Sequence, residues 1–295
     1  MRIEPSRLRI TRTDTQWHTP FFRFIREIFP RATGMSWDLW EKYFGWDDRY
    51  EVLALVLDGG LVATMGRTRM RLVVDGEERA GIQLGAVATR ADLRGRGLAR
   101  ALMGWMTEEL EHPDQPVILF ANDSVLEFYP RFGFRRVMQT RFVAKAPIRP
   151  AGNPVKPFDI ANPGDRARLA ALAARAPVSG WRFGARDYYS ILLWHLTNRP
   201  HRAFWLEDLD GWIATETKDE RLMILDAIAN RPRPLREILP CVIDRPIAEA
   251  TFGFDPEALW PAADLNLSAE TDHPLFVRGL DLADGPLRFP DLAQT

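Results

Sequence analysis

A strand, a glycine-rich turn and an amphipathic helix follow one another in residues 84–103, LGAVATRADLRGRGLARALM. The helix is predicted over 97–111, because leucine or methionine recurs at every fourth position from Leu98 to Leu110. The first turn of a helix has backbone N–H groups without an internal partner, and the helix dipole there favours negative charge. This order of elements therefore predicts an anion-binding site where the turn meets the helix.

The residue types in the turn point to a bulky anion such as pyrophosphate. Gly95 and Gly97 allow positive φ and let the backbone approach a ligand closely. Three arginines add positive charge around them: Arg94, Arg96 and Arg100. The turn is not a P-loop, because Lys-Ser/Thr does not follow the glycines, and it lacks the acidic residue that a dinucleotide fingerprint places about 20 positions later at a strand end. A surface loop with solvated arginines is the alternative.

The flanking elements predict a βαβ unit that follows an antiparallel meander. Helices are predicted over 16–30 and 36–45 (the second capped by Ser36), then strands over 51–58, 61–74 and 79–89 with hairpin turns at Gly59-Gly60 and Asp75-Gly76. After the helix at 97–111 come a short apolar strand at 117–120, a helix at 123–131 and a strand at 136–144. A strand, a crossover helix and a further strand in this order form a βαβ unit.

A proline-rich segment divides the chain. Residues 149–157, RPAGNPVKP, contain three prolines and one glycine, so we place a linker there between domains at 1–148 and 158–295. Beyond it the order of elements partly repeats: helices at 163–175 and 186–197, strands at 202–207, 211–217 and 221–228, a helix at 235–243, and strands at 247–254 and 274–280. Where a second phosphate turn would stand, residues 229–234 (ANRPRP) have two prolines and no glycine.

The first domain resembles the acetyl-CoA-dependent acyltransferases of the GNAT superfamily. Their motif Arg/Gln-x-x-Gly-x-Gly/Ala is met by Arg94, Gly97 and Ala99, and their Asn-x6-Tyr-x3-Gly-Phe segment by Asn122, Tyr129 and Gly133-Phe134. The AVATRADLRGRGLARALM and FYPRFGF runs are also similar to enhanced-intracellular-survival-type acetyltransferases. The resemblance implies an α/β (α+β) GNAT fold, a mixed central sheet flanked by helices. The repeated order of elements predicts a second, degenerate GNAT-like domain, and the missing glycine turn predicts that this domain has lost cofactor binding, as in tandem GNAT proteins.

The resemblance implies acetyl transfer from acetyl-CoA, used as a co-substrate, to an amine of a small molecule that attacks the thioester directly. The strand end Val87-Ala88-Thr89 would pair with the pantetheine amides, and the turn would hold the diphosphate through Arg94, Gly95, Arg96, Gly97, Leu98, Ala99 and Arg100. Tyr129 would protonate the leaving sulfur, since a neutral phenol can donate a proton; the alternative is a ring packed among phenylalanines. Asn122 would either contact the cofactor or cap the helix after it.

No general base is assigned, although Glu77 and Glu78 stand near the position that is acidic in some family members. The resemblance also implies catalysis by a terminal carboxylate, but the tail LRFPDLAQT follows a different domain here, so Thr295 is given no role. A non-catalytic acyl-CoA sensor and a protein-amine acetyltransferase are the competing functions.

The acceptor is left open by the sequence. In the family it lies over the first two helices, which here carry an aromatic set suited to a cationic amine or a hydrophobic acceptor: Trp17, Phe21, Phe22, Trp37, Trp40, Phe44 and Trp46, with Asp38, Glu41 and Asp47 between them. For each ring taken singly, a place in the hydrophobic core is the favoured alternative. Arg67 and Arg69 favour an anionic acceptor instead.

Composition excludes several classes of protein. The 39 Lys and Arg against 40 Asp and Glu give a net charge of -1, which argues against a nucleic-acid partner. A single cysteine, Cys241, excludes an intramolecular disulfide, and His195 and His201 lack convergent carboxylates, so no metal is assigned. No run approaches the ~20 apolar residues of a membrane span. We expect a cytoplasmic protein without a membrane partner, and a homo-oligomer is compatible with the sequence.

Overall fold

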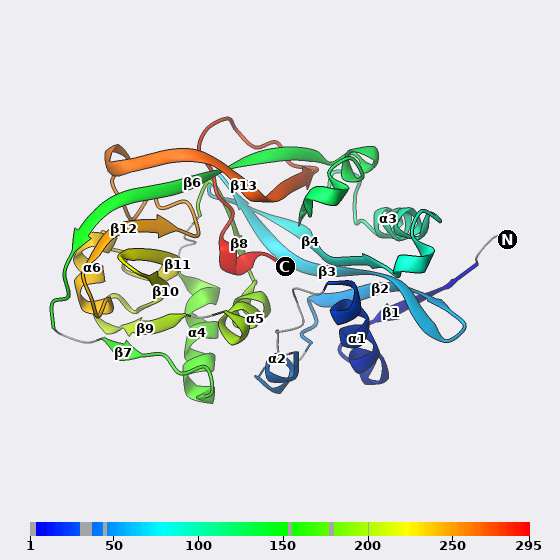
Figure 1. Cartoon of the computed structure of the whole chain (residues 1–295), viewed down its shortest axis with the longest axis horizontal. Coiled ribbons are helices and arrows are strands. Elements are labelled where there is room, and N and C mark those ends of the chain that lie inside the picture. The colour runs from blue at the N-terminus through cyan, green and yellow to red at the C-terminus, as the bar shows by residue number, and fades with distance from the viewer. Residues whose placement is uncertain (1–3, 30–36, 44–45, 153–154, 177–179, 200) are drawn as a thin grey trace.

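The computed structural model describes residues 4–29, 37–43, 46–152, 155–176, 180–199 and 201–295 (Figure 1). Its strands form one sheet in the order β1-β2-β3-β4-β5-β13-β6-β12-β11-β10-β9-β7, with β8 paired to β3. The strands are β1 (Ser6–Ile10), β2 (Tyr50–Leu57), β3 (Gly60–Val74), β4 (Glu77–Thr89), β5 (Val117–Phe120), β6 (Arg135–Ile148), β7 (Lys156–Pro157), β8 (Phe183–Arg186), β9 (Arg202–Leu206), β10 (Gly211–Lys218), β11 (Arg221–Ala229), β12 (Ile247–Phe252) and β13 (Leu265–Arg278). The helices are α1 (His18–Ile28), α2 (Trp37–Tyr43), α3 (Leu98–Glu108), α4 (Pro163–Arg175), α5 (Tyr189–Asn198) and α6 (Leu235–Val242).

The predicted meander and βαβ unit are present in the first half. The turn before β3 has positive φ at Asp58 and Gly59, and the turn before β4 at Asp75 and Gly76. Two successive left-handed residues form the type I′ turn that suits a two-residue hairpin, so the strands twist together without splaying. The first of these turns lies one residue earlier than predicted. After α3, β5 returns parallel to β4, as a crossover connection requires.

Opposite faces of this half carry different helices. Val52 and Ala54 of β2 pack in one cluster with α1, whereas Leu53 and Leu55 pack in another with α3. Side chains alternate between the faces of a strand, and the unbroken apolar run from Val52 to Leu57 is therefore what a strand covered on both sides requires.

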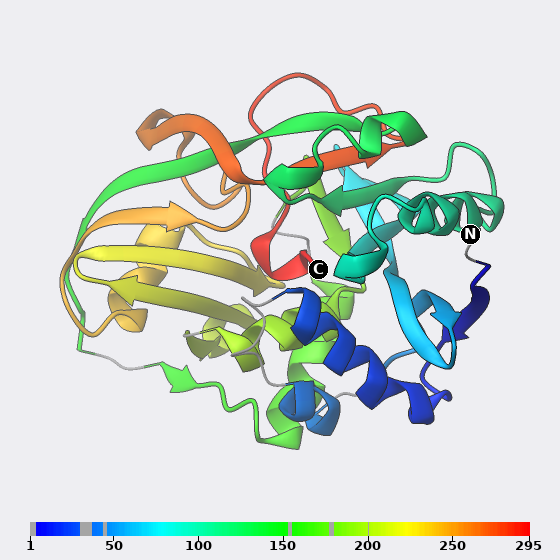
Figure 2. The same cartoon turned by 45° about the vertical axis from the view of Figure 1, so that its right-hand side comes forward.

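The second half repeats the arrangement of the first. Strands β9, β10 and β11 form an antiparallel meander, and β12 follows α6 and pairs parallel with β11. The last strand of each half lies in the other half: β6 pairs with β12, and β13 is inserted between β5 and β6. Figures 1 and 2 show β6 and β13 running side by side across both halves. The largest hydrophobic cluster accordingly combines side chains of both halves, such as Leu72 and Leu192.

Three local features differ from the prediction. The helix expected at 123–131 is two 3-10 turns, Asp123–Val125 and Tyr129–Phe132, with Pro130 in the second turn removing a backbone donor. Strand β13 begins at Leu265, because β6 pairs with residues that are mostly exposed and show no clear apolar alternation. Strands β1, β7 and β8 were not predicted. The expected cap Ser36 lies outside the described residues. The linker at 149–157 stays a prediction, because one sheet continues through both halves and does not itself divide the chain into two domains.

Candidate active site

The glycine-rich turn leads directly into α3. Gly97 occupies the N-cap position with φ 83°, and no side chain caps the helix. Gly95 also has positive φ, 75°. A Cβ added at either glycine would meet nothing within 4 Å. The glycines are therefore required by the left-handed backbone, and the space in front of the turn is open to a ligand.

The arginines of the turn are available to bind an anion. Arg94, Arg96 and Arg100 form no ion pair with any residue that the structure describes, and Arg94 and Arg96 are exposed. Arg90, four residues before Arg94, is instead held by Asp92 at 2.8 Å between Nε and Oδ1. Arg94 also donates through Nε to the carbonyl of Thr89 at 3.4 Å, which joins the turn to the end of β4. Positive charge and free helix N–H groups thus converge at the mouth of α3.

Strands β4 and β5 separate beside this turn. They pair only from Ile82 to Leu84, opposite Val117–Leu119. Beyond Leu84 the β3–β4 register shifts and Ala86 takes a φ of 49°, with its carbonyl accepting from Oγ1 of Thr64 at 3.0 Å. This bulge turns the end of β4, Val87-Ala88-Thr89, away from β5. The edge of β4 that faces β5 is therefore left with unpaired N–H and C=O groups, the groups that an extended amide chain can pair with.

Tyr129 lies on the same side of β4 as the turn. It belongs to one hydrophobic cluster with Leu98 and Leu84, and it is only 5% exposed. Its ring contacts Phe128, Phe134 and, from the second half of the chain, Phe276 at 5.6 Å between centroids. Burial raises the pKa of Tyr129 to about 12, so the hydroxyl stays protonated at neutral pH. The ring packing proposed as the alternative is present, and it also fixes the hydroxyl in place.

Asn122 follows the end of β5 and is exposed. It stands at the N-cap position of the first 3-10 turn, but its side chain makes no capping hydrogen bond there. The turn is closed by backbone alone, through the N–H of Val125 and the carbonyl of Asn122 at 3.1 Å. The side-chain amide is therefore not used as a cap.

The aromatic set of the first two helices forms core. Phe21, Phe22, Trp40 and Trp46 are each at most 5% exposed and pack against β2. His18 stacks on Trp46 at 4.3 Å between ring centroids. Phe44 and the side chains of Trp37 and Asp38 lie outside the described part of the chain. The rings that the structure describes are thus mostly enclosed by one another.

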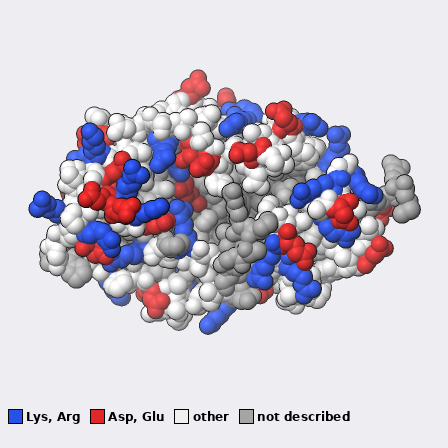
Figure 3. Space-filling view, viewed as in Figure 1, with Lys and Arg blue, Asp and Glu red and all other residues white. Residues whose placement is uncertain are grey.

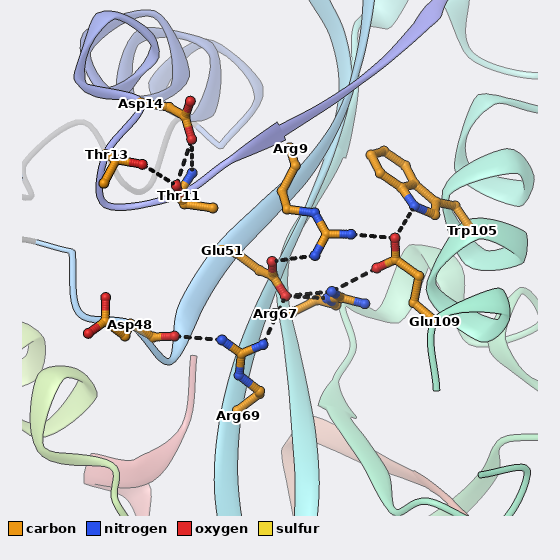
Figure 4. Close-up of polar contacts among 10 residues, drawn as sticks. All are labelled: Arg9, Thr11, Thr13, Asp14, Asp48, Glu51, Arg67, Arg69, Trp105 and Glu109. Carbon is orange, nitrogen blue, oxygen red and sulfur yellow. Dashed lines mark hydrogen bonds and ion pairs between the residues drawn. The ribbon is translucent and has the colours of Figure 1, made fainter. Parts of the chain in front are cut away.

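Arg67 belongs to a buried ion network and is not available to an acceptor (Figure 4). It forms ion pairs with Glu51 and with Glu109, which follows α3. Glu51 also forms an ion pair with Arg9 at 3.0 Å. Although desolvation opposes ionisation of Glu51, the hydrogen bonds and charges of these arginines hold its pKa below its usual value. Arg69 contributes to the same network and donates to the carbonyl of Asp48 at 2.6 Å.

The two glutamates considered for a base are far from the bulge. Glu77 pairs with Arg79, and Glu78 pairs with Arg71 and Arg186. They stand at the start of β4, whereas the bulge is about eight residues further along, or roughly 25 Å at the rise of a strand. Neither glutamate therefore reaches the end of β4.

Sequence reasoning missed the contact between the end of the chain and β4. Gln83 is fully buried and forms hydrogen bonds with the backbone of Ala293 and of Thr295. Thr295 also lies against Gly85: if Gly85 carried a Cβ, that atom would be 2.5 Å from Oγ1 of Thr295. His195 of α5 bonds the carbonyl of Gln294 at 2.7 Å through Nε2. A glutamine inside the apolar run IQL was the one sequence signal, because a buried amide needs polar partners.

A separated pair of parallel strands beside an anion-binding turn at a crossover helix defines an acyltransferase-like fold and site. Residues 9–137 match the family model described as an acetyltransferase (GNAT) domain. The first half of the chain is therefore similar to a GNAT domain. No curated protein matches the sequence.

Solved structures share the fold over nearly the whole chain. A probable N-acyltransferase from Enterococcus faecalis superposes with a TM-score of 0.64 at 14% identity, covering 94% of this chain and 73% of that one. Eis1 from Mycobacterium abscessus gives 0.59 at 16% identity, covering 92% and 73%. A GCN5-related N-acetyltransferase from Anabaena variabilis gives 0.58 at 14% identity, covering 92% and 72%. At these identities the likeness establishes the fold, and the fold prediction is confirmed.

Two further properties concern the described residues. They contain no group of three or more His, Cys, Asp and Glu side chains arranged to hold a metal ion. None of their helices has the length and apolar character needed to cross a bilayer.

Proposed function

We propose that this protein is an acetyl-CoA-dependent N-acetyltransferase that acetylates an amine of a small molecule by direct attack on the thioester. The observation that carries the proposal is the turn at 94–97, where two left-handed glycines and unpaired arginines stand at the mouth of α3. Acyl transfer is the reaction class of the family that the domain matches. Acetyl-CoA would supply the activated acyl group.

The chain's own groups suit each part of such a donor. N–H groups of the first turn of α3, with Arg94, Arg96 and Arg100, would bind the diphosphate. The unpaired edge of Val87-Ala88-Thr89 would pair with the amides of the pantetheine arm, and one of its N–H groups would polarise the thioester carbonyl. Asn122, whose amide caps nothing, is free to hydrogen-bond the same arm.

Tyr129 would give a proton to the departing sulfur. Its raised pKa keeps it in the donating form, and its packing against three phenylalanines removes the rotational freedom that a catalytic donor must lose. We assign the role of general acid to Tyr129 on this basis.

Calorimetry with acetyl-CoA tests the donor site. The double variant Arg94→Gln/Arg96→Gln should weaken binding at least about tenfold and flatten its salt dependence, since two phosphate-directed charges are removed. Arg90→Gln is the matched control, because that arginine is already paired with Asp92, and its affinity should match the wild type. No heat with acetyl-CoA in the wild type, or equal loss in the control, would refute the site.

A turnover assay distinguishes the proposed function from the two competing functions. Thiol release from acetyl-CoA over a panel of amines should be seen with the wild type and should fall in Tyr129→Phe while acetyl-CoA affinity is kept. A non-catalytic acyl-CoA sensor predicts no difference between the two proteins. A protein-amine acetyltransferase predicts acetylation of peptide amines in preference to the small-molecule panel.

A further inference from the structure

A charged cavity lies where the two halves of the chain meet. It has a volume of about 350 Å³, enough for about a dozen water molecules. Its wall combines β6, α5, the β11–β12 pair, β13 and the end of the chain. Nothing of α1 or α2 lines it, so it is distinct from the surface where the family resemblance places the acceptor.

A distortion of β13 builds one side of this cavity. Glu270 pairs with Gln139 and Leu275 pairs with Val137, so four residues of β13 lie between these pairs where β6 has one. The extra residues include Asp272 and His273, which both line the cavity. His273 has a φ of 52°, a left-handed conformation that is unfavourable for a residue with a side chain. Such distortions re-aim side chains away from the sheet.

The cavity borders the candidate active site at two points. Next to His273, the carbonyl of Pro274 accepts from the N–H of Ala121, the residue between β5 and Asn122. On the other side Gln294 lines the cavity, and the next residue, Thr295, bonds Gln83 and packs on Gly85, where β4 begins to leave β5. The cavity thus adjoins the ends of both strands between which the acyl group would lie.

The charges of the cavity are balanced in number. Three arginines and three carboxylates line it: Arg141, Arg199, Arg288, Glu270, Asp272 and Asp291. Arg288 is held between Glu270 and Asp291 at 2.7 and 2.9 Å, and Arg199 pairs with Glu216 at 3.2 Å. In the described part of the chain, Arg141 and Asp272 have no ion-pair partner. On the outer surface, Figure 3 shows Lys and Arg side chains intermixed with Asp and Glu side chains over one face of the molecule.

We propose that this cavity is the acceptor site and that it takes a zwitterion, an amine that also carries a carboxylate, as amino acids do. Arg141 would bind the carboxylate and Asp272 the ammonium group of the incoming acceptor. The ammonium group would then lose a proton to water, and the neutral amine would attack the thioester. A polycation would leave Arg141 unmatched and place positive charge among three guanidinium groups, while a plain anion would leave Asp272 unmatched. The reaction in this inference rests on the proposed function, and the ligand class rests on the charges that line the cavity.

Matched pairs of acceptors test the class directly. Each pair is an amino acid and the amine formed by its decarboxylation, for example lysine with cadaverine and tryptophan with tryptamine. The amino acid should be acetylated with a kcat/KM at least about tenfold higher, the worth of one charged hydrogen-bonded pair. Arg141→Gln should remove this preference by raising KM for the amino acid with kcat largely kept. Arg136→Gln, an exposed arginine of the same strand outside the cavity, should keep the preference.

A binding measurement separates the two proposals. The melting temperature of the wild type should rise with the preferred amino acid and should not rise in Arg141→Gln. Equal or better turnover of the decarboxylated amines, or an unchanged preference in Arg141→Gln, would overturn the zwitterion site and leave the acetyltransferase proposal intact. A melting shift by amino acids without thiol release from any amine would support the cavity and overturn the proposed reaction. If there is neither a melting shift nor any turnover, both proposals are overturned.

Discussion

The backbone N–H of Thr295 donates a hydrogen bond of 2.6 Å to Oε1 of Gln83, a residue 212 positions earlier in the chain. The amide of Gln83 donates in turn to the carbonyl of Ala293 at 2.7 Å. Gln83 belongs to the last stretch of β4 that pairs with β5. One buried side chain therefore fixes the final residues beside the point where the two strands separate.

Replacing Gln83 by methionine should disturb both stability and turnover. The change keeps the volume but leaves two backbone groups of the tail without their partner, which should lower the free energy of unfolding by about 1–3 kcal/mol. Displacement of the tail from Gly85 should lower kcat/KM about tenfold or more. Urea denaturation and the thiol-release assay measure the two effects.

Gln115→Met is the control for this prediction. Gln115 is also buried, but among the described residues its Oε1 accepts only from the nearby N–H of Glu111 at 2.9 Å. This variant should lose a similar part of its stability and keep its kcat/KM. If both variants lose activity equally, the tail contact has no specific role at the site.

Gly97→Ala should weaken acetyl-CoA binding beyond its effect on folding. An alanine at φ 83° costs roughly 1–2 kcal/mol of stability, although its methyl group would meet nothing. Gly76→Ala is matched in both respects, with the same φ and equally open space, in a hairpin turn at the far end of β4. Calorimetry should show loss of affinity in the first variant alone, and loss in both would mean that destabilisation explains it.

The rate of acetyl transfer should not fall through ionisation of Tyr129 in the ordinary tyrosine range. The pKa of a tyrosine is near 10, but burial raises that of Tyr129 to about 12. The donor form should therefore persist between about pH 8 and 10, and kcat for a given amine should hold or rise there. A pH profile of kcat checks this, and an alkaline limb near pH 10 that disappears in Tyr129→Phe would contradict it.

His195 should make the protein sensitive to acid. Burial lowers its pKa from the usual 6.5 to about 4, so the folded protein binds a proton there less readily than the unfolded chain. The contribution of His195 to stability is fully present above pH 6.5, and as the pH falls towards 4 the protein loses from it on the order of 3 kcal/mol of the free energy of unfolding. His195→Gln keeps a donor for the Gln294 carbonyl and does not titrate. Urea denaturation between these pH values should show a smaller slope in the variant; an equal slope would assign the acid sensitivity elsewhere.

Removing Arg67 alone should be more damaging than removing it with its partner. Arg67→Met leaves the buried Glu51 with less compensation and should cost about 3–5 kcal/mol. Adding Glu51→Leu should recover part of that loss, because the uncompensated charge is gone. Arg79→Met, which breaks an exposed pair with Glu77, should cost under about 1 kcal/mol. A double variant less stable than Arg67→Met in urea would contradict this account.

Local pattern was sufficient for most elements. The meander and the crossover helix follow from hairpin turns and a four-residue apolar spacing, which are encoded within a few residues. Helix α4 has the predicted bounds, and the structure shows that the side chain of Asn162 caps it. Strand β13 was found only in part, since its exposed first half has no apolar alternation and exists because β6 pairs with it. The aromatic residues of α1 were ambiguous in the sequence, because a ring in the core and a ring on a pocket wall have the same helical spacing.

By itself the sequence determined the strand, turn and helix of the proposed donor site, because φ preferences, helix capping and apolar periodicity act between neighbouring residues. Only the tertiary structure decided the exchange of β6 and β13, the contact of Thr295 with Gln83 and the cavity beside it. These depend on pairing between segments more than a hundred residues apart, for which many partners satisfy the same local pattern. The proposed donor site thus depends on local sequence, whereas the proposed acceptor site depends on how the two halves of the chain are joined.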